Sequence, residues 1–189
     1  MDKRSGATAE TRGRIVAATL DLHARKGIFA TSWQDIARAA DVSVGTVYKH
    51  FPSLEQLVPA CGELLMQKAA PPSADDITGI IGTATAPRER LLRVCQALFE
   101  FYHRNEIYLE PDPRERELAA VREWEEHLRT TVTHFVKEAV SPQQLSEPVM
   151  QSAAARLDFM SFRAMRLRGI SVELAGEMTA DMLTAWLNL

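Results

Sequence analysis

Apolar residues recur every three or four positions along most of the chain, and no segment alternates apolar and polar residues long enough to predict a strand. That spacing places apolar side chains along one face of an α-helix. The longer helical patterns cover residues 9–26, 87–105, 113–139, 148–168 and 171–187. The sequence therefore predicts an all-α fold, with a small N-terminal helical domain followed by a larger C-terminal helical bundle.

Two short helices joined by a tight turn are predicted within residues 31–51. Ser32 and Ser43 stand just before them, where a serine hydroxyl can accept hydrogen bonds from the free amides of the first helical turn. Asp41, between the helices, tolerates the left-handed conformation in which many helices end. Together these features predict a helix-turn-helix, whose second helix enters the major groove of DNA.

The outward face of the second helix carries side chains that suit DNA. Thr46 can bond a phosphate or a base edge, and Gly45 lets the backbone approach the duplex closely. Tyr48, Lys49 and His50 offer donors to phosphate oxygens. Any one of them could be an ordinary solvated residue, but the whole set at this spacing favours DNA binding. The predicted DNA-binding residues are Ser32, Trp33, Gln34, Ser43, Val44, Gly45, Thr46, Tyr48, Lys49 and His50.

Residues 9–57 resemble the DNA-binding domain of TetR-family transcriptional regulators, over about the first third of the chain. The resemblance implies a homodimer on a palindromic operator in double-stranded DNA, and a body that binds a small-molecule effector. At Leu54 the family often has a lysine that contacts phosphate, so that contact is not expected here. The matching residues are Ile15, Ala17, Ala18, Gly27, Phe29, Ala30, Thr31, Ser32, Asp35, Ile36, Ala37, Ala40, Val42, Ser43, Gly45, Thr46, Val47, Tyr48, His50, Phe51, Ser53, Glu55 and Leu57.

Glycine and proline residues mark the predicted boundaries. Gly27 is expected to end the first helix, after which Phe29 folds back onto the small core. Pro52 ends the second helix of the motif, and Pro59 is expected to kink the helix that follows. Breaker residues fill positions 69–87. The predicted domains are a helix-turn-helix domain at 1–52 with a linking helix at 53–68, and a ligand-binding and dimerisation domain at 69–189.

The middle helices of the body are predicted to face one another and to enclose an effector pocket, which is typically apolar with a few polar groups. Core packing is the alternative for each aromatic residue there. A run of charged residues, Glu115 among them, is expected to form the solvated face of helix 113–139. The candidate ligand-binding residues are Leu98, Phe101, Tyr102, Tyr108, Trp124, His127, Leu128, Met160 and Met165.

The last two predicted helices are the candidates for dimerisation. They carry five of the seven methionines, and more apolar surface than one thin helical hairpin can bury. The resemblance points the same way, because these helices usually form a four-helix bundle across the two-fold axis of the family dimer. The candidate interface residues are Leu157, Phe162, Leu174, Met178, Met182 and Trp186.

Charge is distributed unevenly along the chain. Residues 1–51 carry eight Lys/Arg and five Asp/Glu, a net charge of +3, whereas the remainder carries 14 Lys/Arg and 20 Asp/Glu, a net charge of −6. A basic N-terminal domain on an acidic body suits a protein that presents one end to a polyanion.

Several functions are disfavoured by the sequence. Cys61 and Cys95 lack metal-ligand spacing and are expected to be reduced thiols. Glu100 and His103 form a single Glu-x-x-His motif, whereas helical di-metal sites use paired motifs, so no metal is predicted. No phosphate loop or nucleophile elbow is present, so neither a cofactor nor an enzyme is expected. The chain has no long apolar run and no signal-like start, which indicates a cytoplasmic protein.

These observations predict a sequence-specific DNA-binding transcriptional regulator, expected to be a repressor released from its operator by a small apolar or amphipathic ligand. Two alternatives remain. One is an all-α small-molecule binding protein or enzyme with an accessory helix-turn-helix. The other is a DNA binder that responds to no effector.

Overall fold

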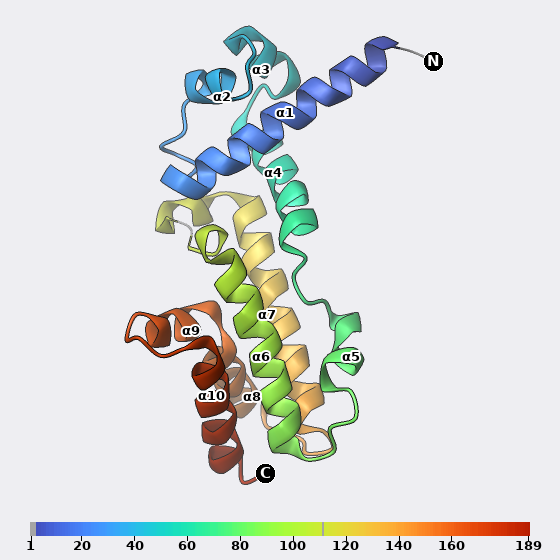
Figure 1. Cartoon of the computed structure of the whole chain (residues 1–189), viewed down its shortest axis with the longest axis vertical. Coiled ribbons are helices and arrows are strands. Elements are labelled where there is room, and N and C mark those ends of the chain that lie inside the picture. The colour runs from blue at the N-terminus through green and yellow to red at the C-terminus, as the bar shows by residue number, and fades with distance from the viewer. Residues whose placement is uncertain (1–2, 111) are drawn as a thin grey trace. The chain divides into compact units, whose positions relative to one another are not determined.

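The computed structural model describes residues 3–110 and 112–189, and side chains from Gly6 onward. Helices and turns account for all the described residues that have regular structure, which confirms the predicted all-α class. The chain forms two compact units, one of residues 1–70 and 110–124 and the other of residues 71–109 and 125–189. We call them the head unit and the body unit (Figure 1).

The head unit is built on α1 (Lys3–Lys26), α2 (Trp33–Ala39), α3 (Val44–His50) and α4 (Leu54–Ala69). Helix α1 packs against α2 and α4, and α2 packs against α3 (Figure 1). One apolar side chain from each helix is fully buried at the centre, namely Ile15, Ile36, Val47 and Leu57. The first helix begins at Lys3, earlier than the predicted residue 9, and its N-terminal part is polar.

Both predicted serine caps are present. The Ser32 hydroxyl accepts a hydrogen bond from the Asp35 amide at 3.1 Å, and the Asp35 carboxylate accepts one from the Ser32 amide at 3.3 Å. The Ser43 hydroxyl accepts from the Thr46 amide at 3.1 Å. Asp41 adopts the left-handed conformation at φ 53°, as expected for the turn between the helices. Three hydrogen bonds thus cap the starts of two helices of seven residues each, and Asp41 forms the turn between them.

The connection from α1 to α2 differs from the prediction at one residue. Gly27 ends α1 with φ 85°, as expected. Ile28, not Phe29, then folds onto the core, because Ile28 is buried whereas Phe29 is 42% exposed. Apolar character alone did not distinguish these two neighbours.

The body unit is arranged around α6 (Pro87–Asn105), whose bounds match the prediction. Helix α10 (Val172–Leu187) lies along α6 (Figure 1), with Gly176 of α10 next to Gln96 of α6. The remaining elements of this unit are η1 (Ala74–Asp76), α5 (Ile77–Ile81), η2 (Glu106–Tyr108), α8 (Glu147–Leu157), α9 (Phe159–Arg166) and the later part of α7 (Ala119–Val140).

Two helical predictions in the C-terminal half were wrong in detail. The helix expected from residue 113 starts at Ala119, because Pro113–Glu117 form the 3-10 helix η3 and Leu118 is extended. The helix expected over 148–168 is divided into α8 and α9 at Asp158, whose ψ of 153° is extended. Helical periodicity continues across both breaks, so it could not reveal them.

Candidate nucleic-acid interface

The predicted DNA-binding residues lie on α2, on α3 and at the capped starts of both helices. Ile36, Ala37 and Val47 face the core of the head unit and are buried. The opposite sides of α2 and α3 leave the candidate side chains accessible. Ser32, Gln34, Ser43, Gly45, Tyr48 and Lys49 are exposed, and Trp33, Val44, Thr46 and His50 are half-buried.

Two contacts tie the predicted residues to one another. The rings of Trp33, the first residue of α2, and Tyr48, on α3, have centroids 4.9 Å apart and planes tilted by 34°. The hydroxyls of Ser43 and Thr46 are 2.9 Å apart. The interface is therefore partly organised before any ligand binds. Trp33 is half-buried.

The negative charge at the start of α2 is compensated locally. Lys26 Nζ lies 2.6 Å from the Asp35 carboxylate. The hydrogen bond from Lys26, together with those from the Ser32 hydroxyl and amide, holds the pKa of Asp35 well below its usual range. Asp35 therefore stays ionised at neutral pH, and its neighbouring ammonium offsets repulsion of a phosphate backbone.

Glu115 is a residue of the head unit whose role the sequence did not reveal. It was expected on a solvated face, but it is buried, and its carboxylate accepts a hydrogen bond from the Ile28 amide at 2.5 Å. The segment Pro113–Glu117 thereby holds the connection that leads into α2. Its burial depends on a contact with a residue far away in sequence, which no local pattern reports.

The candidate ligand-binding residues fall into separate environments. Leu98, Phe101 and Tyr102 are buried in the body unit, where the Tyr102 ring meets the rings of Phe99, Phe101, Phe159 and Phe162 at centroid distances from 5.7 to 6.2 Å. Tyr108, Leu128 and Met165 are half-buried, whereas His127 and Met160 are exposed. Trp124 is half-buried and belongs to the head unit. Phe101 and Tyr102 therefore belong to one packed aromatic cluster.

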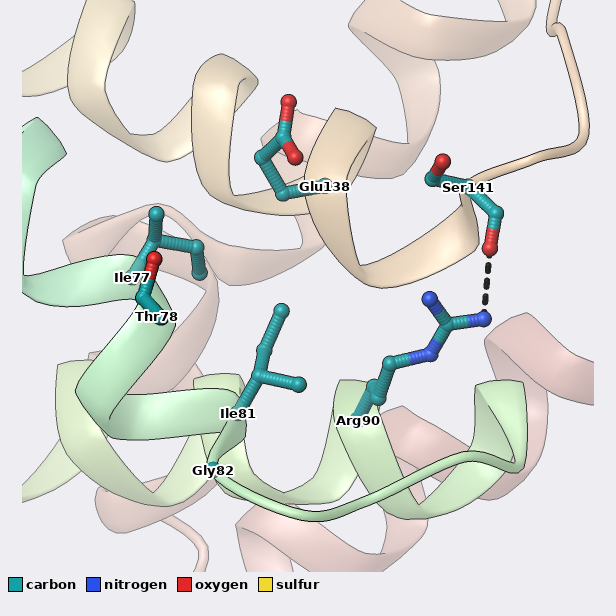
Figure 2. A pocket seen from close by; sticks show the side chains of 7 residues that line it. All are labelled: Ile77, Thr78, Ile81, Gly82, Arg90, Glu138 and Ser141. Atoms are coloured by element: carbon teal, nitrogen blue, oxygen red, sulfur yellow. Dashed lines mark hydrogen bonds between the residues drawn. The ribbon is translucent and has the colours of Figure 1, made fainter.

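An open pocket of about 220 Å³ lies elsewhere in the body unit, and none of the predicted residues lines it. Figure 2 shows Arg90 at one side of it, where the side chain donates a hydrogen bond to the Ser141 carbonyl at 2.5 Å. The pocket is lined by Ile77, Thr78, Ile81, Gly82, Arg90, Glu138 and Ser141. Its position depends on how α5 packs against the ends of two other helices, which sequence spacing does not report.

The candidate dimer residues also divide into two groups. Leu174, Met178, Met182 and Trp186 recur every four residues on α10, and each is between 46% and 48% exposed. We call these four residues the α10 stripe. Leu157 and Phe162 are fully buried in the body unit, so they offer no surface to a second copy.

The described residues offer neither a metal-binding cluster nor a membrane-spanning helix. Among the described residues, no group of three or more His, Cys, Asp or Glu side chains could hold a metal ion. Cys61 and Cys95 are free, and burial raises the pKa of each thiol to about 12. Within the part of the chain that the structure describes, no helix combines the length and apolar character needed to cross a bilayer.

Comparisons with known proteins agree with this geometry. The family described as "Bacterial regulatory proteins, tetR family" matches residues 15–61. The HTH-type transcriptional repressor KstR of Rhodococcus jostii (strain RHA1) is 44% identical over 57 residues, which are 30% of this chain and 27% of that protein. The HTH-type transcriptional repressor KstR2 of Mycobacterium tuberculosis (strain CDC 1551 / Oshkosh) is 27% identical over 118 residues, 61% of this chain and 57% of that protein.

The fold extends the likeness beyond the head unit. A TetR-like transcriptional regulator from Rhodococcus sp. RHA1 superposes with a TM-score of 0.64 at 17% identity, over 94% of this chain and 96% of that one. The helix-turn-helix and the family match over it define the class of the protein, a DNA-binding transcriptional regulator. Residues 15–61 therefore match the DNA-binding domain of the tetR family of bacterial regulatory proteins, and the whole chain shares the fold of a TetR-like regulator. The chain spans between 27% and 57% of the length of the two curated relatives described above.

Proposed function

We propose that this protein is a sequence-specific DNA-binding transcriptional repressor. The observation that carries the proposal is the capped α2–α3 pair, whose outward faces leave Thr46, Tyr48 and Lys49 accessible while the inward faces are buried. Helix α3 enters the major groove, with Gly45 and Thr46 at base edges and Tyr48, Lys49 and His50 at phosphates. The relatives named as transcriptional repressors support repression over activation.

The proposed active form is a homodimer that reads a palindromic operator. A single seven-residue recognition helix contacts only a few base pairs, so two copies on half-sites about 34–36 Å apart are needed for specificity. The α10 stripe supports this assembly, because four large apolar side chains on one helix face gain free energy when a second copy covers them. Leu157 and Phe162 are buried within the subunit, so the proposed interface does not depend on them.

The proposed effector is a small apolar or amphipathic molecule that binds the body and releases the DNA. A ligand can shift the protein from its DNA-binding state only by as much as it prefers the other state, and a coupling of about 1–3 kcal/mol is typical. The support for an apolar ligand is the aromatic cluster around Tyr102, whose rings are packed against one another here, so the ligand would have to part them to bind. We place this activity in the cytoplasm, where the operator would be.

The experiment that tests the proposal is selection of bound duplexes from a random DNA pool at about 0.15 M salt. A palindromic consensus with half-sites about one helical turn apart is the expected result. Binding without any consensus would instead indicate a DNA binder of low specificity. Absence of salt-dependent DNA binding would refute the proposal and favour an all-α ligand-binding protein with an accessory helix-turn-helix.

A further inference from the structure

Trp33 and Tyr48 form an aromatic pair at the outer surface of the helix-turn-helix. Their ring centroids are 4.9 Å apart at a 34° tilt, within the range at which aromatic rings attract one another. Tyr48 is 45% exposed, so its ring lies at the surface of the head unit and not inside its core. The indole of Trp33 is therefore a restraint on the Tyr48 side chain that lies outside that core.

The two partners are anchored unequally. Trp33 begins α2, directly after Ser32, whose hydroxyl and amide both bond Asp35. Asp35 is tied in turn to Lys26 of α1 at 2.6 Å. The backbone that carries Trp33 is thus fixed by cap interactions and by a link to α1. Tyr48 lies in the last turn of α3, where its side chain projects outward.

We propose that Trp33 is a positioning residue: it holds the Tyr48 ring in the orientation that presents the phenolic hydroxyl to a DNA phosphate. The inference rests on the proposed function and deepens it, because it assigns Trp33 a role through Tyr48 instead of its own contact with DNA. An unrestrained tyrosine on a helix surface samples several rotamers, and fixing it on binding costs free energy. If the Tyr48 ring is already packed on the indole in the free protein, less conformational entropy is lost when it binds DNA.

The inference predicts which properties of DNA binding change in variants of Trp33 and which do not. The Trp33→Ala variant should bind the selected duplex about 5- to 100-fold more weakly, because an aromatic pair contributes to each of two heads. The salt dependence should stay unchanged, since neither ring carries a charge that releases counterions. The consensus should also stay unchanged, because a phosphate contact carries no direct sequence information. Trp33→Phe keeps an aromatic ring and should recover most of the affinity.

A double-mutant cycle tests this dependence. The full-length wild type, Trp33→Ala, Tyr48→Ala and the double variant are titrated against the selected duplex. Gln67→Ala, at an exposed position of α4 outside the DNA-binding set, is the control, and thermal unfolding verifies the fold. The expected result is that the double variant binds no more weakly than Tyr48→Ala alone. Losses that multiply would overturn the inference and make Trp33 an independent DNA contact. An unchanged affinity for Trp33→Ala would also overturn it.

A second measurement tests the contact between the Trp33 and Tyr48 rings in the absence of DNA. In the free protein, the NMR signals of the Tyr48 ring protons should be displaced by the neighbouring indole and should move toward solvent-exposed values in Trp33→Ala. Unmoved signals would overturn the inference even if the wild type binds DNA. Conversely, a wild type that binds no duplex would refute the proposed function while the ring-proton shifts still report whether Trp33 restrains Tyr48.

Discussion

The Glu115 carboxylate accepts a hydrogen bond from the backbone amide of Ile28 at 2.5 Å, across 87 positions of sequence. Glu115 is buried, and so is the Ile28 side chain. The contact lies directly after α1 and a few residues before the Ser32 cap of α2. A carboxylate from the segment before α7 therefore helps to fix the entry into the DNA-binding motif.

Replacing Glu115 should destabilise the head unit. In Glu115→Ala the Ile28 amide loses its partner in a buried site, which typically costs about 1–3 kcal/mol. Urea unfolding should report that loss, and Glu117→Ala, an exposed neighbour, should leave stability within about 0.5 kcal/mol of wild type. Equal stability of the two variants would mean that the buried contact contributes nothing net.

Gly27→Ala should also be destabilising, for two separable reasons. Gly27 has φ 85°, which strains an L-residue, and a Cβ there would lie 2.9 Å from the Glu115 carboxylate oxygen. We expect a cost of about 1–3 kcal/mol in wild type. In a Glu115→Ala background the steric part disappears, so the cost of Gly27→Ala should be smaller. The same cost in both backgrounds would leave backbone strain as the sole cause.

His23 should make the protein less stable as the pH falls. Its Nε2 atom is buried without a hydrogen-bond partner among the described residues, and burial lowers the pKa from 6.5 to about 4. Because the unfolded chain binds the proton more readily, stability should decline as the pH falls from about 6.5 to about 4, by up to about 3 kcal/mol. His23→Gln should flatten this slope in urea unfolding, whereas His103→Gln, at an exposed position, should not.

A charge in the α10 stripe should dissociate the proposed dimer. Met178 and Met182 are 48% and 47% exposed, so Met178→Glu and Met182→Glu should leave the subunit folded. In a two-fold interface each substitution occurs twice, and the dimer dissociation constant should rise at least about 100-fold. Sedimentation velocity checks this, with Glu177→Ala as the exposed control on the same helix. A Met178→Glu protein that remains fully dimeric would place the interface elsewhere.

Lys49→Ala should weaken DNA binding without changing the consensus. Lys49 is exposed in the last turn of α3, where its ammonium can meet a phosphate. Affinity should fall by similar factors for all duplexes, and the salt slope should decrease by about one per head. Titrations at several salt concentrations measure both, and Lys137→Ala, on an exposed position of α7, is the charge-matched control. A changed consensus would assign Lys49 to base recognition instead.

Local sequence was sufficient to predict the caps and turns of much of the head unit. Ser32, Ser43, Gly27 and Asp41 act through neighbours within a few residues, so their types and spacing predicted the caps and turns correctly. The bounds of α6 were predictable for the same reason, since Pro87 suits the first turn of a helix and the apolar stripe continues to its end.

The errors have a common physical origin in contacts between distant segments. Glu115 was assigned to solvent because charged residues surround it, yet its burial depends on Ile28. The choice between Ile28 and Phe29 depends on which side of the turn meets the core. The break at Asp158 interrupts a pattern that is helical on both sides. None of these outcomes is determined by the residues next to them.

The two cysteines give the molecule an internal reporter for each unit. Cys61 is buried in the head unit and Cys95 in the body unit, and the raised pKa of each thiol suppresses its reactive thiolate. A thiol reagent can therefore modify either one only when its own unit opens. The labelling rates of Cys61 and Cys95 would measure how often each half of the chain opens locally, and whether a ligand or DNA that holds one half closed changes the opening of the other.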